Sequence, residues 1–302
     1  MSLPSTPEGW AIHLSRLVRA VHQAHGSPRF PIDVASIAKE FSRNVFPKNP
    51  ITKIEGTALS SRFEGMLLPH PDKNGEWGIV YNSGIRSKGR INFTLAHELG
   101  HYLLHRLLAP EGIQCSVRDM HTWKTAYGQR EAQANTFASF LLMPLDDFRT
   151  QIDGAPISLA LMRDLSDRYA VSITAAILKW LSITSRRGMI VVSKDGFIDW
   201  SWSSEGLIRT GVFFRARQEI TPVPPGSLAA RSVPTETELD AVQPAGVWPG
   251  HESVHEFTMF APRSDMVITL LLYPDVPSAR FTDSDDDGLL ATDEHFAVFG
   301  RR

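Results

Sequence analysis

The stretch 94-TLAHELGHYLLH-105 determines how the rest of this sequence is interpreted. It places three histidines and one glutamate within nine residues of an otherwise apolar segment. Residues four apart share one face of a helix, so His97 and His101 can point at the same metal ion, with Glu98 beside them. This H-E-x-x-H order is the zinc-binding arrangement of many metal-dependent peptidases. The stretch therefore predicts a metal-binding helix, for which Asn92 is a candidate N-cap.

The predicted chemistry requires these residue types. Neutral imidazoles bind Zn²⁺ and leave one coordination position open, and the metal lowers the pKa of a bound water from about 15.7 toward 7. A carboxylate such as Glu98 can take the proton and pass it to the leaving amine. The alternative is that His97 and His101 are a purely structural pair. The apolar helix around them favours the metal site.

A third protein ligand is expected from a second helix, 130-REAQANTFASFLLM-143, which Pro144 ends. Glu131 lies near its start, and Asn135 follows one turn later on the same face. Two antiparallel helices would place Glu131 opposite the histidines, giving a His₂Glu site of the gluzincin type. The apolar residues expected to pack against the first helix are Ala134, Phe137 and Leu141.

Other polar groups near the motif are weaker candidates. His105 continues the face of His97 and His101 but lies about two turns, some 12 Å, from the first ligand, so we expect it beside a ligand or exposed. An oxyanion-stabilising group could come from Tyr102, Tyr127 or His121, and nothing in the spacing selects one of them.

Two strings of this sequence resemble ImmA/IrrE-type metallopeptidases: 93-FTLAHELGHYLLH-105 and 131-EAQANTFASFLLMP-144. That family shows an F-T-x-A-H-E-L-G-H helix and then an E-x-x-A-N-x-F-A helix ending in L-L-M-P. The resemblance covers about residues 28–185 and includes the preceding hairpin, with a glycine after Phe63 and with Asn82.

The resemblance implies a zincin-like peptidase that cleaves helix-turn-helix repressors of the XRE type and so derepresses genes, as in stress responses. It implies one Zn²⁺ held by His97, His101 and Glu131, with Glu98 as general base. The family's next helices resemble a helix-turn-helix, and residues 158–184 match that in outline. Few basic residues lie there, so direct DNA binding is not expected and a small packing subdomain is favoured.

Composition limits the classes of function. The 302 residues include 31 basic and 33 acidic side chains, for a net charge of −2, so binding driven by phosphate charge is not expected. The single cysteine, Cys115, excludes an internal disulfide. Its thiolate could occupy the open zinc position, but a lone cysteine is more often passive. With no signal peptide or transmembrane run, we expect a cytoplasmic protein without membrane partners.

The expected fold class is α+β, in three parts. Residues 1–150 form a mainly helical zincin-like domain with a small β-sheet, residues 151–186 a helical subdomain, and residues 187–302 a C-terminal α+β domain, for which a sensory or regulatory role is expected by analogy alone. The expected elements are helices at 6–24, 33–42 and within 157–184, hairpins at 63–82 and 188–202, a strand at 265–274 and a long loop at 221–250.

Residues 283–294 fit the EF-hand loop template, with acidic side chains at positions 1, 3, 5 and 12 and Gly288 at position 6. No helix is expected before this loop and no second loop of the kind is present, so Ca²⁺ binding is less favoured than a solvated acidic loop.

The alternatives to a peptidase are a transcriptional or sensory regulator and an inert protein that only binds its partner. Loss of activity in Glu98→Gln would separate them.

Overall fold

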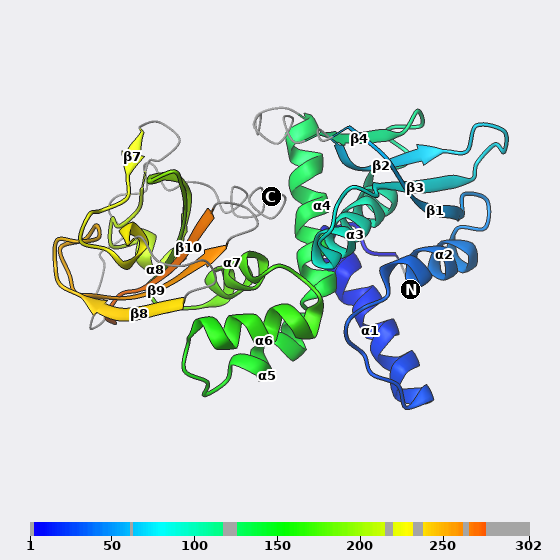
Figure 1. Ribbon diagram of the computed structural model, residues 1–302. Helices are drawn as coiled ribbons and strands as arrows, with labels where there is room; N and C mark the ends of the chain where they lie inside the picture. Colours follow the sequence, from blue (N-terminus) through cyan, green and yellow to red (C-terminus); the bar gives the residue numbers. More distant parts are fainter. Residues whose placement is uncertain are drawn as a thin grey trace, which may run out of the picture. The chain divides into compact units, whose positions relative to one another are not determined.

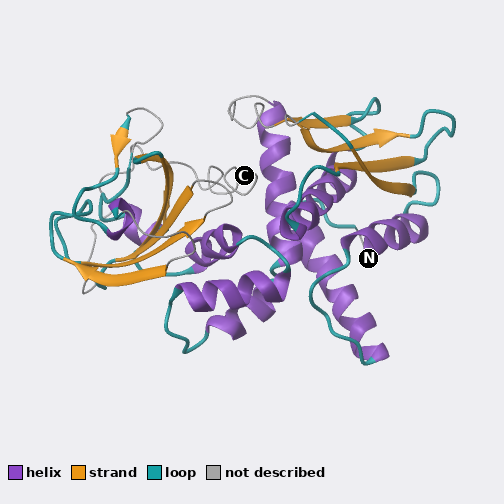
Figure 2. Cartoon of the chain, in the orientation of Figure 1, coloured by secondary structure: helices purple, strands orange, loops and turns teal. Residues whose placement is uncertain are grey.

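The computed structural model describes residues 3–60, 63–116, 126–214, 220–231, 238–261 and 266–275. These divide into two compact units. The first contains the described residues up to Asp153 together with Leu165–Ser172, and the second contains Gly154–Asp164 and the described residues from Ile173 to Asp275. Helices and two separate sheets make a mixed α+β fold, as the sequence predicts (Figures 1 and 2). The acidic loop at 283–294 lies outside the described residues.

The first unit combines five helices with a four-stranded sheet of order β1-β3-β2-β4. The helices are α1 (Pro7–His25), α2 (Val34–Val45), α3 (Lys88–His105), α4 (Ala126–Leu142) and α5 (Leu145–Ile152). The strands are β1 (Ile51–Thr57), β2 (Phe63–Pro69), β3 (Trp77–Asn82) and β4 (Ile113–Ser116). The expected hairpin is present, since β2 and β3 are antiparallel, and β1 joins β3 in parallel.

Side-chain caps set where the helices begin. The Thr6 hydroxyl accepts a hydrogen bond from Gly9 N at 3.1 Å, and Asp33 accepts one from Ser36 N at 3.1 Å, which satisfies amides that the first turn leaves unpaired. The expected Asn92 cap of α3 is wrong. The helix begins earlier, and Ser87 Oγ accepts from Arg90 N.

The sheet supports α3, which carries the motif. Leu67 and Ile79 pair across β2 and β3 and are fully buried, and α3 lies against both strands. Helix α4 in turn packs along α3 and α1 (Figure 1). Because the motif helix is enclosed by a sheet on one side and a helix on another, its polar side chains are removed from water and need partners within the protein.

Gly100 allows α3 and α4 to approach closely. A Cβ at this position would lie 3.0 Å from Phe137 Cδ1 and 3.2 Å from Ala134 Cα, tighter than most real contacts. Ala134, Phe137 and Leu141 are fully buried, in agreement with the expected face of α4. This close approach brings the polar side chains of the two helices within reach of one another.

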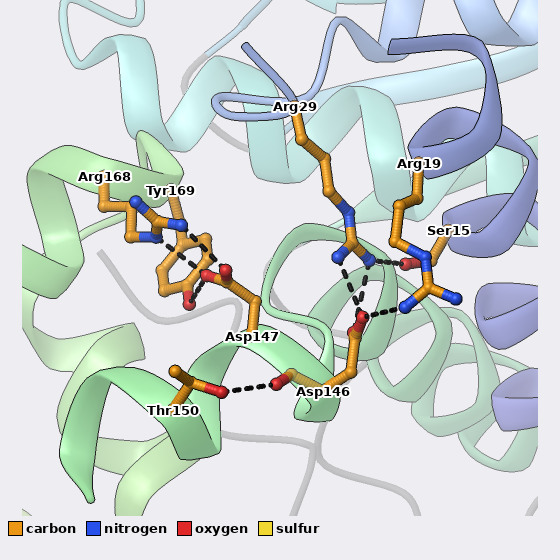
Figure 3. Close-up of polar contacts among 8 residues, drawn as sticks. All are labelled: Ser15, Arg19, Arg29, Asp146, Asp147, Thr150, Arg168 and Tyr169. Carbon is orange, nitrogen blue, oxygen red and sulfur yellow. Dashed lines mark hydrogen bonds and ion pairs between the residues drawn. The ribbon is translucent and has the colours of Figure 1, made fainter. Parts of the chain in front are cut away.

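The start of α5, a helix absent from the sequence prediction, anchors the end of α4 (Figure 3). Asp146 receives hydrogen bonds from Arg29 at 2.8 and 3.2 Å and from Arg19 at 3.1 Å. Arg29 also donates to Ser15 on α1. The Asp146–Arg19 pair is about half exposed and contributes little stability, whereas Arg29 is mostly covered.

Asp147 bonds to a different segment (Figure 3). Arg168 donates to both carboxylate oxygens at 2.7 Å, and the Tyr169 hydroxyl donates at 2.6 Å. The Tyr169 ring stacks on Phe148, with centroids 5.8 Å apart. Two adjacent acidic residues thus fix α5 to α1 and to the C-terminal end of helix α6 (Leu159–Tyr169).

The second unit contains a six-stranded antiparallel sheet of order β7-β6-β5-β10-β9-β8. Its strands are β5 (Gly188–Lys194), β6 (Phe197–Ser203), β7 (Thr221–Pro222), β8 (Glu238–Gln243), β9 (Val254–Ala261) and β10 (Met266–Leu272). Its short helices are α7 (Ile173–Ile183), α8 (Glu205–Ile208) and a 3-10 turn at Leu228–Ala230. The predicted turn between β5 and β6 is confirmed, with positive φ at Asp195 and Gly196.

The expected surface loop at 221–250 is wrong in part. It contributes two strands to the sheet, β7 and β8, and its Leu228 and Trp248 are almost fully buried. Glu256 on β9 explains how the segment is held: its carboxylate accepts from Leu228 N, Ala229 N and Trp248 Nε1, each at 3.0 Å. A buried carboxylate with this many donors is satisfied, so the described parts of this segment pack into the unit.

Candidate metal centre

The three expected ligands lie together between α3 and α4. His97 and His101 are one turn apart on α3, and Glu131 faces them from α4. One ligand atom from each falls within 4.8 Å of the other two, and all three side chains are buried. The two Nε2 atoms are 3.0 Å apart, and each is 3.2 Å from an oxygen of Glu131.

This donor set fits a metal ion. Tetrahedral zinc with bonds of about 2.0–2.1 Å separates its ligand atoms by roughly 3.3 Å. The observed separations of 3.0 and 3.2 Å are close to that value. Two imidazoles and one carboxylate also leave a fourth position for water or substrate, as catalytic zinc sites do. The three residues could therefore hold a metal ion.

Hydrogen bonds on the far side of each ring orient the two histidines. His97 Nδ1 lies 2.8 Å from Asn135 Oδ1, one turn beyond Glu131 on α4. His101 Nδ1 lies 3.0 Å from His105 Nδ1. His105 is 2% exposed, so it lies beside a ligand rather than in solvent. Partners of this kind set which ring nitrogen faces a metal.

The electrostatics of the centre favour one added positive charge. Burial would lower the pKa of His97, but the hydrogen bond and charge of Glu131 outweigh it and raise the pKa to about 9. The pKa of His101 is lowered, first by burial and then by the neighbouring His97 charge. Burial would raise the pKa of Glu131, but both rings hold it well below its usual range. A metal ion can supply the charge that this carboxylate stabilises.

Glu98 is fully buried next to the ligands, and a glycine makes room for it. A Cβ at Gly65 on β2 would lie 2.7 Å from Glu98 Oε1 and 2.6 Å from Thr94 Cγ2. Asn82 holds the start of β2 by donating to Phe63 O at 3.0 Å. The sequence motifs do not predict this role for Gly65. A glycine inside a predicted strand is the signal for such a close backbone approach.

The remaining candidates are placed differently. The Tyr102 hydroxyl donates to Asn49 O at 2.5 Å, and burial raises its pKa to about 12, so its hydrogen bond is committed to the chain. Tyr127 lies on α4 one turn before Glu131 and is partly buried, so it stays a candidate. His121 and the Cys115 side chain lie outside what the structure describes.

A helix with H-E-x-x-H, packed on a second helix that brings the third ligand, defines a metallopeptidase-like domain. Residues 59–180 match the family model Peptidase_M78, described as the IrrE N-terminal-like domain. This match confirms the resemblance to the ImmA/IrrE family over these residues. No curated protein matches the chain.

Within the described residues, no helix is both long enough and apolar enough to cross a membrane.

Proposed function

We propose that this protein is a zinc-dependent endopeptidase that cleaves a protein substrate. The observation that carries the proposal is the buried cluster of His97, His101 and Glu131, with ligand atoms within 4.8 Å of one another and Glu98 beside them. Two neutral nitrogen donors and one carboxylate suit zinc better than magnesium or calcium, which prefer oxygen ligands.

The residues divide the work of hydrolysis. His97, His101 and Glu131 would hold the zinc ion, which would supply the Lewis acidity that polarises a carbonyl and acidifies a water. Glu98 takes the proton from the attacking water and passes it to the leaving amine as the peptide bond breaks. The Glu98 side chain is therefore a carboxylate again at the end of each turnover. Asn135 orients the His97 ring through Nδ1, and the α3–α4 contact keeps Glu131 opposite both histidines. Burial between sheet and helices limits competing water.

We propose a helix-turn-helix repressor of the XRE type as the substrate, so that cleavage derepresses its target genes. The support is the family assignment and the resemblance of both motifs. We further propose that residues 151–186 are a helical subdomain and that residues 187–302 are a regulatory or sensory domain in the cytoplasm. The near-neutral charge supports a protein partner rather than nucleic acid.

The test compares the wild-type chain with Glu98→Gln and Glu131→Gln. We expect about one bound zinc per wild-type chain, zinc retained in Glu98→Gln, and zinc lost in Glu131→Gln. Turnover of Glu98→Gln should fall at least about a hundredfold, the usual size of a general-base contribution. Substrate is sought by co-expressing the repressor encoded nearest the gene and mapping fragments by mass spectrometry. An unchanged rate in Glu98→Gln would refute the peptidase.

A further inference from the structure

His105 is a buried titratable side chain that the proposed reaction does not use. It lies at the C-terminal end of α3 and is 2% exposed. Its Nδ1 is 3.0 Å from His101 Nδ1, and its Nε2 is 2.8 Å from Gln133 Oε1. Either ring can donate in a contact between two imidazoles, so the group bound to the outer nitrogen of His105 selects the arrangement of protons.

The partners fix that arrangement. Gln133 Oε1 is an acceptor, so His105 Nε2 carries a proton and donates it. A neutral His105 then presents a lone pair at Nδ1, which accepts from Nδ1–H of His101. His101 Nε2 is left with its lone pair toward the centre, 3.2 Å from Glu131. The chain of contacts therefore sets which nitrogen of His101 can bind a metal.

The Nδ1 atoms of the two ligand histidines contact different kinds of acceptor. For His97 a side-chain amide, Asn135 Oδ1, accepts directly at 2.8 Å. For His101 the acceptor is a second imidazole, and the amide of Gln133 lies one step further out on the exposed side of α4. Removal of the intermediate ring would take away the acceptor that the described residues provide for Nδ1–H of His101.

We propose that His105 is a positioning residue that holds His101 in the Nδ1–H form, with Gln133 as its outer partner. The inference deepens the proposed function, since it rests on the same metal centre. Without His105, His101 would place its proton on Nε2, where the Glu131 carboxylate accepts it. A proton there competes with a metal ion for the same lone pair.

The test uses a matched pair of substitutions in the full chain. Asparagine and leucine have nearly the same shape, but only asparagine offers an oxygen near the position of His105 Nδ1. We expect His105→Leu to weaken zinc binding about 10- to 100-fold, as loss of an outer hydrogen-bond partner does. His105→Asn should stay within about threefold of wild type. Competition with a chelator of known affinity gives these constants.

A second measurement needs no metal. In ¹⁵N spectra of the metal-free protein, His101 should carry its proton on Nδ1 in wild type and His105→Asn, and on Nε2 in His105→Leu. The His101 tautomer separates the His105 proposal from the peptidase proposal. If wild type bound no zinc, the peptidase proposal would be refuted, and the tautomer measured without metal would still test the role of His105. Gln133→Leu should have a smaller effect, because water can replace an exposed acceptor.

The controls separate position from stability. His22→Leu removes a partly buried imidazole on α1 that bonds to Ser27, and it should leave zinc affinity unchanged. Leu14→Ala, a buried change on α1, should lower stability while the folded protein binds zinc as wild type does. Equal zinc affinity in His105→Leu and His105→Asn, or an unchanged His101 tautomer in His105→Leu, would overturn the proposal.

Discussion

Gly65→Ala tests whether the backbone of β2 positions the Glu98 carboxylate. The added Cβ would lie 2.7 Å from Glu98 Oε1 and 2.6 Å from Thr94 Cγ2. Since ordinary contacts begin near 3.4 Å, the oxygen must retreat by about 0.7 Å or β2 must move away. Overpacking of this size costs about 1–3 kcal/mol of unfolding free energy. The displaced base should also lower kcat by about 10- to 100-fold, because a misplacement near 1 Å can cost a hundredfold.

A neighbouring strand offers the control. A Cβ at Gly78 on β3 would lie 3.6 Å from Lys53 O, its nearest contact, so Gly78→Ala should fold and turn over as wild type does. Urea unfolding gives the stability of each variant, metal analysis its zinc content, and peptide hydrolysis its kcat and KM. Zinc content should be unchanged in both, because the ligands are not touched. If Gly65→Ala kept wild-type kcat and stability, the positioning of Glu98 by β2 would be wrong.

Three further predictions concern packing and charge. Gly100→Ala should widen the α3–α4 contact by a few tenths of an ångström and weaken zinc binding, measured by chelator competition; unchanged affinity would contradict the role of the close approach. Burial would raise the pKa of Asp147, but Arg168 and Tyr169 outweigh it and lower the pKa, so its contribution to stability is present above about pH 4 and lost as pH falls through the folded value. Urea unfolding should therefore show Asp147→Asn less stable than wild type at pH 7 and the gap closing in acid; a gap independent of pH would argue against it. Free zinc at 100 times its Kd should stabilise the wild type by about 2.7 kcal/mol in the same assay, and Glu131→Gln should lose this gain.

The ligand cluster could be predicted because it depends on spacing within each of two helices and on the apolar faces that pair them. The four-residue spacing of His97 and His101 follows from the helical period, and the apolar face of the second helix implies the pairing that brings Glu131 near. The partners of the outer nitrogens are less visible. His105 meets Gln133 from a separate helix, and no period in the sequence relates the two.

Where the sequence predicts an element wrongly, the element is stabilised by contacts with residues far away in the chain. The sequence does not indicate the start of α3, because Gly89 is a poor helix former; in the structure a Cβ at Gly89 would lie 2.8 Å from the backbone of Val171. The Pro- and Gly-rich composition of 221–250 predicts a loop, but β8 pairs with β9 and gains its order from that neighbour. Helix α5 is short, and its anchors are arginines on other elements.

The order of strands in the first sheet has a consequence for biosynthesis. Among the described strands β1 pairs with β3 alone, and β3 is made about twenty residues later, after the whole of β2. On the ribosome the N-terminal strand must therefore wait, with its backbone groups bonded to water, until the β2–β3 hairpin has left the exit tunnel. Glu131 emerges later still, so a nascent chain truncated before α4 can show both histidines yet lack the carboxylate that completes their grip on an ion.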